Sequence, residues 1–187
     1  VTACCTISSN KFLVGLRNGK LIQWTIDNNK KIDNKTGKIN LIFNSQIQAH
    51  KSAINVIEID KRLGIIITAG EDNFVFIRKI YDFELLTPIK IKDKYIVTMI
   101  KVCQFNLIYI MCSNKIENKS KIFGYTLNGI PFAKSEFDLY ETLDFTRNGN
   151  IVSLIRRKSI KILYGYDLKE MKINNNNDIC KLNDELD

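Results

Sequence analysis

The sequence predicts an all-β protein built from about four successive four-stranded antiparallel meanders. Short runs rich in β-branched and aromatic residues follow one another along the 187-residue chain, separated by small or polar turn-forming residues. These runs recur in groups, and the turns expected between second and third strands centre near Asn18, Asp72, Asn118 and Arg157. Once an insertion in the first interval is set aside, the spacing scatters around a period of about 40 to 45 residues. No helical period competes over a comparable length.

The first unit, 1–48, contains the clearest turn of the chain. Asn18-Gly19 separates two alternating apolar runs, and this dipeptide is typical of a two-residue hairpin in which both central residues need positive φ. The polar segment 27–38 is interpreted as a solvated loop inserted before the last strand. We expect the strands of this unit at 1–7, 11–16, 20–26 and 39–43.

Three further units follow, over about 49–92, 93–136 and 137–173. Pro88 lies in the last run of the second unit, which indicates an outer strand because proline has no amide hydrogen for an inner ladder. We expect strands of the second unit at 54–59, 63–68, 74–78 and 85–90, and of the third at 95–102, 107–112, 121–127 and 130–135. Those of the fourth are expected at 140–145, 150–155, 159–164 and near 171–173, before a polar, disordered tail at 174–187.

Composition is that of a soluble globular protein. The hydrophobic content of 45% is ordinary, and the longest apolar-plus-small stretch, 63–70, is far shorter than the roughly 20 residues of a membrane span. No secretory leader opens the chain, so we expect a cytoplasmic location, and because Val1 is not a methionine we interpret the chain as a fragment of a longer protein. The five cysteines include no C-x-x-C pair, so we expect no metal site, disulfide framework or cofactor.

Polar residues stand at matching points of the second unit. His50 comes just before its first strand, Thr68 ends its second strand, and Asp72 lies in the tight turn to its third. Trp24 occupies a related place in the first unit, five residues after Gly19. This pattern resembles a WD40 repeat, in which His, Ser/Thr, Asp and Trp form a hydrogen-bonded chain across one propeller blade. The resemblance implies a partial WD40-type β-propeller of about four blades, with His50, Thr68, Asp72 and Trp24 as a structural tetrad.

The chain departs from the repeat pattern in two respects. Arg78 occupies the Trp position in the only unit that keeps His, Thr and Asp, so no unit has the whole tetrad. The other three units have no histidine, and we expect their blades to rest on apolar packing and strand pairing. His50 has no partners at the spacing of a metal site or a catalytic triad, which favours a structural role.

A closer resemblance covers about 49–136. The segments 50–54, 66–72, 77–84 and 122–129 are similar to the C-terminal WD40 region of BEACH-domain proteins of the neurobeachin type. That resemblance implies a large cytoplasmic scaffold in vesicle trafficking or membrane remodelling, peripheral to membranes, with the propeller as its docking platform. It also implies a BEACH domain upstream in the full-length protein.

The basic residues predict a charged face if the units are blades. The loops entering each first strand and the turns between second and third strands then share one end of the sheets and carry Arg17, Lys51, Lys92, Lys94, Lys115, Lys119, Lys121, Arg156, Arg157 and Lys158. Such a face attracts acidic peptides, anionic lipid headgroups or RNA. A second explanation of the net charge of +8 stays open, because abundant Lys, Ile and Asn are what an A+T-rich coding sequence produces.

These observations predict a non-catalytic protein-interaction scaffold whose partners are other proteins. The stretch 15–20 is not interpreted as a phosphate loop, because it is one residue short, lacks the Ser/Thr and leads into a strand. The carboxylates of Glu136, Asp138 and Glu141 are interpreted as part of a solvated loop. The alternative is a WD40 propeller bound to RNA or a ribonucleoprotein through its basic face. Aromatic residues on exposed loops would favour that alternative, but here they mostly fall inside strands.

Overall fold

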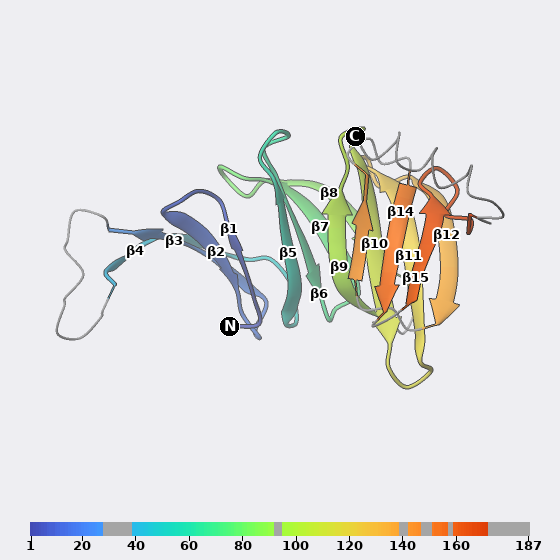
Figure 1. Cartoon of the computed structure of the whole chain (residues 1–187). Coiled ribbons are helices and arrows are strands. Elements are labelled where there is room, and N and C mark those ends of the chain that lie inside the picture. The colour runs from blue at the N-terminus through green and yellow to red at the C-terminus, as the bar shows by residue number, and fades with distance from the viewer. Residues whose placement is uncertain (28–38, 92–94, 139–141, 147–150, 157–158, 172–187) are drawn as a thin grey trace. The chain divides into compact units, whose positions relative to one another are not determined.

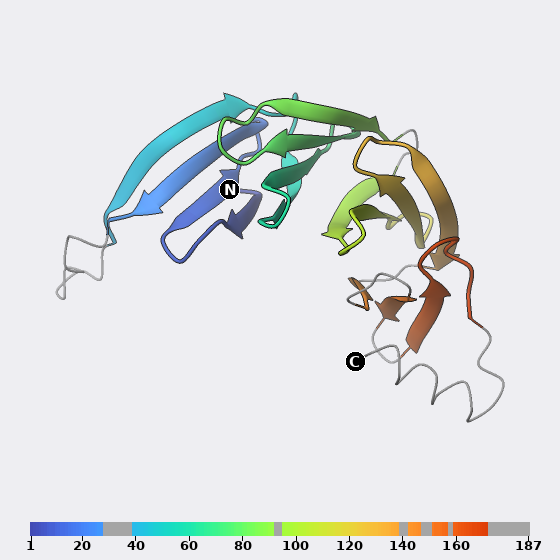
Figure 2. The same ribbon diagram turned by 90° about the horizontal axis from the view of Figure 1, so that it is seen from above.

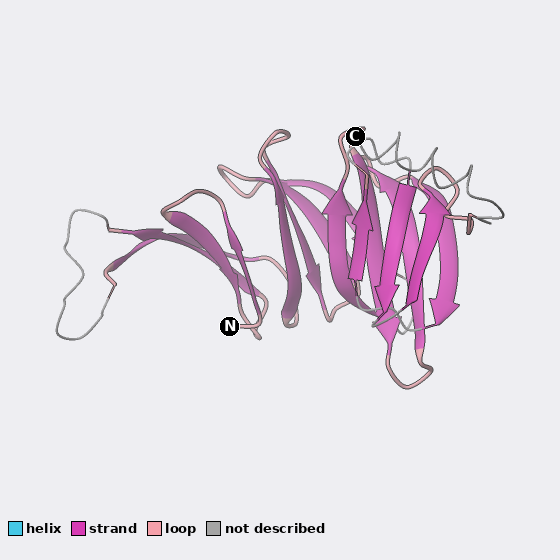
Figure 3. Ribbon diagram, viewed as in Figure 1, coloured by secondary structure: helices cyan, strands magenta, loops and turns pink. Residues whose placement is uncertain are grey.

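The computed structural model describes residues 1–27, 39–91, 95–138, 142–146, 151–156 and 159–171. These residues form fifteen strands and no helix, arranged as four antiparallel sheets (Figures 1 and 3). The chain divides into two compact units, 1–93 and 94–187, and each unit contains two of the sheets. The all-β prediction is therefore confirmed.

The first sheet of unit 1 is a meander in which strands adjacent in sequence are adjacent in space. Its strands are β1 (Ala3–Thr6), β2 (Lys11–Gly15), β3 (Lys20–Ile26) and β4 (Leu41–Gln48), in that order. A hairpin joins β2 to β3 at Asn18-Gly19 as predicted, but its turn type differs: Gly19 has φ of 79°, Asn18 does not have positive φ, and the amide of Gly19 donates to the carbonyl of Leu16 at 3.1 Å. The predicted last strand, 39–43, was too short: β4 continues past a bulge opposite Gln23 and Trp24, and its polar half pairs with the start of β3.

The second sheet of unit 1 repeats this topology. Its strands are β5 (Ile54–Asp60), β6 (Ile65–Gly70), β7 (Phe74–Lys79) and β8 (Leu85–Lys90), in that order. Every residue of β6 is buried, whereas β8 is the outer edge strand and contains Pro88, as predicted. In unit 1, β1 and β5 lie on one side and β4 and β8 on the other (Figure 2).

An apolar core joins the two sheets of unit 1. It is formed by Leu13, Leu21, Ala49, Ile54, Ile57, Ile66, Ile80 and Phe83. The two sheets lie close together at Gly15, where an added Cβ would lie 2.9 Å from the Cβ of Ile54. A side chain at this position would therefore force the two sheets apart.

Unit 2 contains the third and fourth sheets. The third consists of β9 (Ile96–Val102), β10 (Leu107–Asn114), β11 (Lys119–Thr126) and β12 (Pro131–Asp138). The fourth consists of β13 (Thr142–Phe145), β14 (Ile151–Arg156) and β15 (Ser159–Tyr164). The core between them includes Tyr109 from β10, whose hydroxyl donates to the carbonyl oxygen of Gly165 at 3.0 Å.

The fourth sheet has three strands where four were predicted. Glu170 forms an isolated antiparallel bridge with Leu163, and the amide of Met171 donates to the carbonyl of Ile162 at 2.9 Å, so the chain begins to pair with β15. The rest of the predicted strand and the predicted tail, 174–187, lie outside the described residues. Within each unit, the successive meanders give a propeller-like architecture.

Candidate functional site

Three polar side chains form a hydrogen-bonded relay across the second sheet. His50, in the segment between β4 and β5, is only 2% exposed. Its Nδ1 lies 3.0 Å from Oδ1 of Asp72, and its Nε2 lies 2.9 Å from Oγ1 of Thr68. Because a carboxylate only accepts hydrogen bonds, Nδ1 carries the ring hydrogen, and Nε2 of the neutral ring accepts from the Thr68 hydroxyl. The structure thus brings three of the four predicted tetrad residues together.

Asp72 also holds the turn between β6 and β7. Its Oδ2 accepts the amide of Lys51 at 2.8 Å, and its Oδ1 accepts the amide of Phe74 at 3.2 Å. The neighbouring Gly70 leaves room for the relay, because an added Cβ there would lie 2.5 Å from Nδ1 of His50. One carboxylate therefore links the approach to β5 with the turn before β7.

Burial sets the protonation of the relay. Burial lowers the pKa of His50 below 6.5 and outweighs the opposing effect of its hydrogen bond to Asp72. Burial alone would raise the pKa of Asp72, but the hydrogen bonds from the Lys51 amide and His50 lower it below 3.8. A neutral imidazole bound to an ionised carboxylate is thus the favoured state at neutral pH.

The hairpin turn of the first sheet is bound to the relay segment. The carbonyl oxygen of Gly19 accepts the amides of Ala49 and His50, each at 3.0 Å. Nε2 of Gln48 donates to the carbonyls of Asn18 and His50, each at 2.7 Å. These contacts fix the turn of the first sheet beside the start of the second.

Arg17, Lys51 and Glu71 are exposed around this joint, which we call the docking end of unit 1. It consists of the turn at 17–19, Lys51 and the turn at 71–73. The half-buried Asp72 adds a second carboxylate, so the formal charges of the docking end sum to zero, with the cations of Arg17 and Lys51 exposed to solvent.

Trp24 lies apart from the relay, on β3 of the first sheet. Its ring packs edge-on against Phe43 of β4, with the centroids 5.6 Å apart. The relay seen in the described residues therefore has three members, and the Trp predicted for the tetrad contributes to the first sheet instead.

Arg78 stands where the WD40 pattern has its tryptophan. It lies 5.2 Å above the ring of Phe76 and donates to the carbonyls of Phe83 at 3.1 Å and Ala49 at 3.4 Å. Its Nε is buried and has no hydrogen-bond partner among the described residues. Sequence reasoning noted the departure at Arg78 but had no signal for these contacts.

The third sheet contains a pair that sequence reasoning missed. Tyr95, just before β9, donates its hydroxyl to Oε2 of Glu117 in the turn between β10 and β11, at 3.1 Å. The two residues are 22 positions apart, as are His50 and Asp72. The equal spacing is the signal that could have found it.

The predicted basic face is only partly described. Arg17 and Lys51 are exposed in unit 1, and Lys115 is exposed in unit 2. Lys119 and Lys121 both pair with Glu136, at 2.8 and 3.4 Å, so their charges are partly neutralised. Lys92, Lys94, Arg157 and Lys158 lie outside the described residues, and only the backbone of Arg156 is described.

Glu136 lies on β12, opposite Lys121 on β11, and so does not belong to the predicted loop. The pKa of its carboxyl is lowered, chiefly by the hydrogen bond from Lys119. Asp138 ends the same strand, and Glu141 is outside the described residues.

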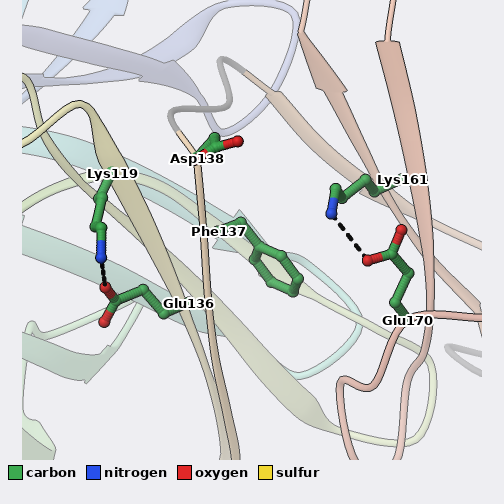
Figure 4. Close-up of a pocket in the computed structure, with 6 residues that line it drawn as sticks. All are labelled: Lys119, Glu136, Phe137, Asp138, Lys161 and Glu170. Carbon is green, nitrogen blue, oxygen red and sulfur yellow. Dashed lines mark hydrogen bonds and ion pairs between the residues drawn. The ribbon is translucent and has the colours of Figure 1, made fainter.

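A recess of about 420 Å³ lies beside this strand (Figure 4). It is lined by Lys119, Glu136, Phe137, Asp138, Lys161 and Glu170. The ion pairs Lys119–Glu136 and Lys161–Glu170, each at 2.8 Å, lie on either side of Phe137. Its lining charges are thus largely satisfied by one another.

The described residues lack two further kinds of feature. They contain no group of three or more His, Cys, Asp or Glu side chains placed to hold a metal ion. They also contain no helix that is long and apolar enough to cross a membrane.

Comparisons with known proteins reveal a similar fold and no relative. No protein-family model matches the chain, and no curated protein matches it. The crystal structure of the computationally designed Ika8 protein is similar, with a TM-score of 0.62 and 16% identity, over 90% of this chain and 47% of that one. The designed Ika4 protein has a TM-score of 0.61 and 16% identity, over 87% and 89% of the two chains. The chain thus spans about half the length of Ika8, and these similarities show the fold alone.

Proposed function

We propose that this chain is a non-catalytic protein-interaction scaffold. The observation that carries the proposal is the state of His50, the single histidine of the chain. Both ring nitrogens are engaged, by Asp72 and Thr68, and the side chain is buried. A metal ligand must reach its ion, and a general base must either reach the substrate or activate a hydroxyl that does, but Thr68 is 0% exposed and so cannot reach a substrate. His50 instead holds turns in place, as a structural residue does.

Rigid turns are what a docking surface needs. A partner that binds preformed loops loses less conformational entropy than one that must order them. At the docking end of unit 1, hydrogen bonds through Gly19, Asp72 and His50 fix the backbone from which Arg17 and Lys51 project. The partner surface that suits these cations is an acidic segment of another protein.

We also propose the protein family to which this scaffold belongs. The likeness of 49–136 to the WD40 region of BEACH-domain proteins supports a scaffold in vesicle trafficking or membrane remodelling, with the BEACH domain upstream. The relay of His50, Thr68 and Asp72 supports the WD40 part of that proposal, because these are the residue types and positions of the repeat.

Affinity capture from cytosol, with and without RNase, tests the function. The bait is the tagged chain, compared with the double variant R17E/K51E. The matched control is K11E/K61E, which reverses two exposed charges, at the start of β2 and in the turn between β5 and β6. We expect captured proteins that resist RNase, disappear with R17E/K51E and persist with K11E/K61E. Capture that requires RNA would contradict the scaffold and support the RNA-associated alternative. Capture that is insensitive to R17E/K51E would exclude the docking end as the binding surface.

A further inference from the structure

The outer edge of the first sheet is an uncharged strand. β4 pairs with β3 on one side and has no partner on the other among the described strands. The segment 39–48 contains no charged residue and no proline, although 26% of the chain is charged. Ile39, Leu41, Ile42 and Phe43 are between 48% and 55% exposed. An open row of backbone donors and acceptors, flanked by exposed apolar side chains, is a template for another strand.

The other outer edges of four-stranded sheets in this chain are protected. β8 contains Pro88 and ends at Lys90, and β12 begins at Pro131 and carries the charged residues Lys134, Glu136 and Asp138. Proline and charge are the usual devices that prevent edge-to-edge pairing. All three outer strands contain a bulge in their pairing, so a bulge does not distinguish β4. What distinguishes β4 is the absence of proline and charge.

The apolar side chains flank both faces of this edge. Phe43 lies opposite Trp24 in the register, on one face of the sheet, and Ile42 lies opposite Thr25, on the other. A strand added at β4 would therefore bury apolar surface on both sides while satisfying the free backbone groups.

We propose that β4 pairs antiparallel with β4 of a second copy of this chain, across a two-fold axis. A two-fold axis places identical edges against each other, so each backbone donor meets an acceptor, as in other isologous dimers. Each chain carries a net charge of +8, and the copies repel least where they meet through an uncharged segment. Among the described strands, β4 is the one outer edge of a four-stranded sheet without proline or charge, so the pairing stops at two copies and joins two four-stranded sheets into one.

Sedimentation velocity on the full chain, from low micromolar to the highest soluble concentration, measures the association. The test variant is I42K, and the matched control is L86K on β8, since Ile42 and Leu86 are 49% and 46% exposed. We expect a concentration-dependent dimer for the wild type and L86K, and a monomer for I42K with unchanged far-ultraviolet circular dichroism. A wild-type monomer at every concentration overturns the proposal. So does a dimer that survives I42K, or one that L86K abolishes equally.

A second measurement does not depend on the folding of a variant. A synthetic peptide of residues 39–48 presents the same strand, and at excess it should compete for β4 and shift the wild-type dimer to monomer. The control peptide has lysine in place of Ile42 and should leave the dimer intact. A dimer unaffected by the first peptide, or dissociated equally by both, overturns the proposal.

Discussion

The carbonyl oxygen of Gly19 lies 3.0 Å from the amide nitrogen of His50, and this hydrogen bond joins the hairpin turn of the first sheet to the relay of the second. The approach is so close that an added Cβ at Gly19 would lie 2.0 Å from the carbonyl oxygen of His50. The turn thus requires glycine for space as well as for its positive φ.

Gly19→Ala tests this joint. We expect the variant to lose about 3 kcal/mol or more of unfolding free energy, because the clash is with backbone that cannot move aside. Gly64→Ala is the matched control: its φ is also positive, at 65°, but the nearest atom to an added Cβ is 4.0 Å away. It should lose only about 1 to 2 kcal/mol, the cost of the left-handed backbone. Chemical denaturation measures both, and equal losses would contradict the clash.

The lowered pKa of His50 predicts a loss of stability in mild acid. As the pH falls below 6.5, His50 takes up a proton in the unfolded chain before it does so in the folded chain. The unfolding free energy therefore decreases as the pH falls from 6.5 to the lower pKa of the folded chain. Denaturation at about pH 7.5 and about pH 5.5 should show this decrease in the wild type. His50→Gln should be less stable overall and lack this contribution. A pKa above 6.5, from the NMR titration of this single histidine, would contradict the prediction.

Arg78→Lys tests the half-buried guanidinium. The two bonds from Arg78 to the carbonyls of Phe83 and Ala49 need the planar fork of arginine, which an ammonium group does not reproduce. We expect a loss of about 1 to 2 kcal/mol in unfolding free energy. Arg62→Lys, at an exposed turn, should change stability by less than about 0.5 kcal/mol. Equal stability of both variants and the wild type would show that the two carbonyl contacts contribute nothing.

Glu136→Gln should make the surface of unit 2 more basic. Glu136 pairs with Lys119 and Lys121, so its neutralisation leaves two adjacent cations without their carboxylate. We expect the variant to elute from a heparin column at higher salt than the wild type. Glu71→Gln removes the same charge from a side chain that has no ion pair in the described residues, and its shift should be smaller. A larger shift for Glu71→Gln would mean that the paired lysines do not form an anion-binding patch.

Short sequence patterns were sufficient to predict most of the strands. The Asn18-Gly19 turn and the alternating apolar runs on either side of it fix a hairpin by backbone chemistry alone. They were insufficient for β4, because Asn44, Ser45 and Gln46 interrupt its apolar pattern and the strand continues only through its pairing with β3. Pairing across a sheet is a tertiary property, and no run of residues encodes it separately.

The relay was visible in the sequence because its residue types recur at fixed places in a known repeat. The contacts of Arg78 and the Tyr95–Glu117 pair were not, since each depends on how a turn folds back. The pairing of Lys119 and Lys121 with Glu136 was missed for a similar reason. Glu136 is 15 positions from Lys121 in sequence and becomes its neighbour only through the register of β11 and β12.

The hydrogen bond from Tyr109 to Gly165 spans 56 positions, whereas each described sheet pairs only strands that follow one another along the chain. A ribosome can therefore release the third sheet strand by strand, yet the buried phenol finds its acceptor only after the fourth sheet has been synthesised. Unit 2 thus combines sheets whose strands pair locally with a buried contact that can close only late in synthesis.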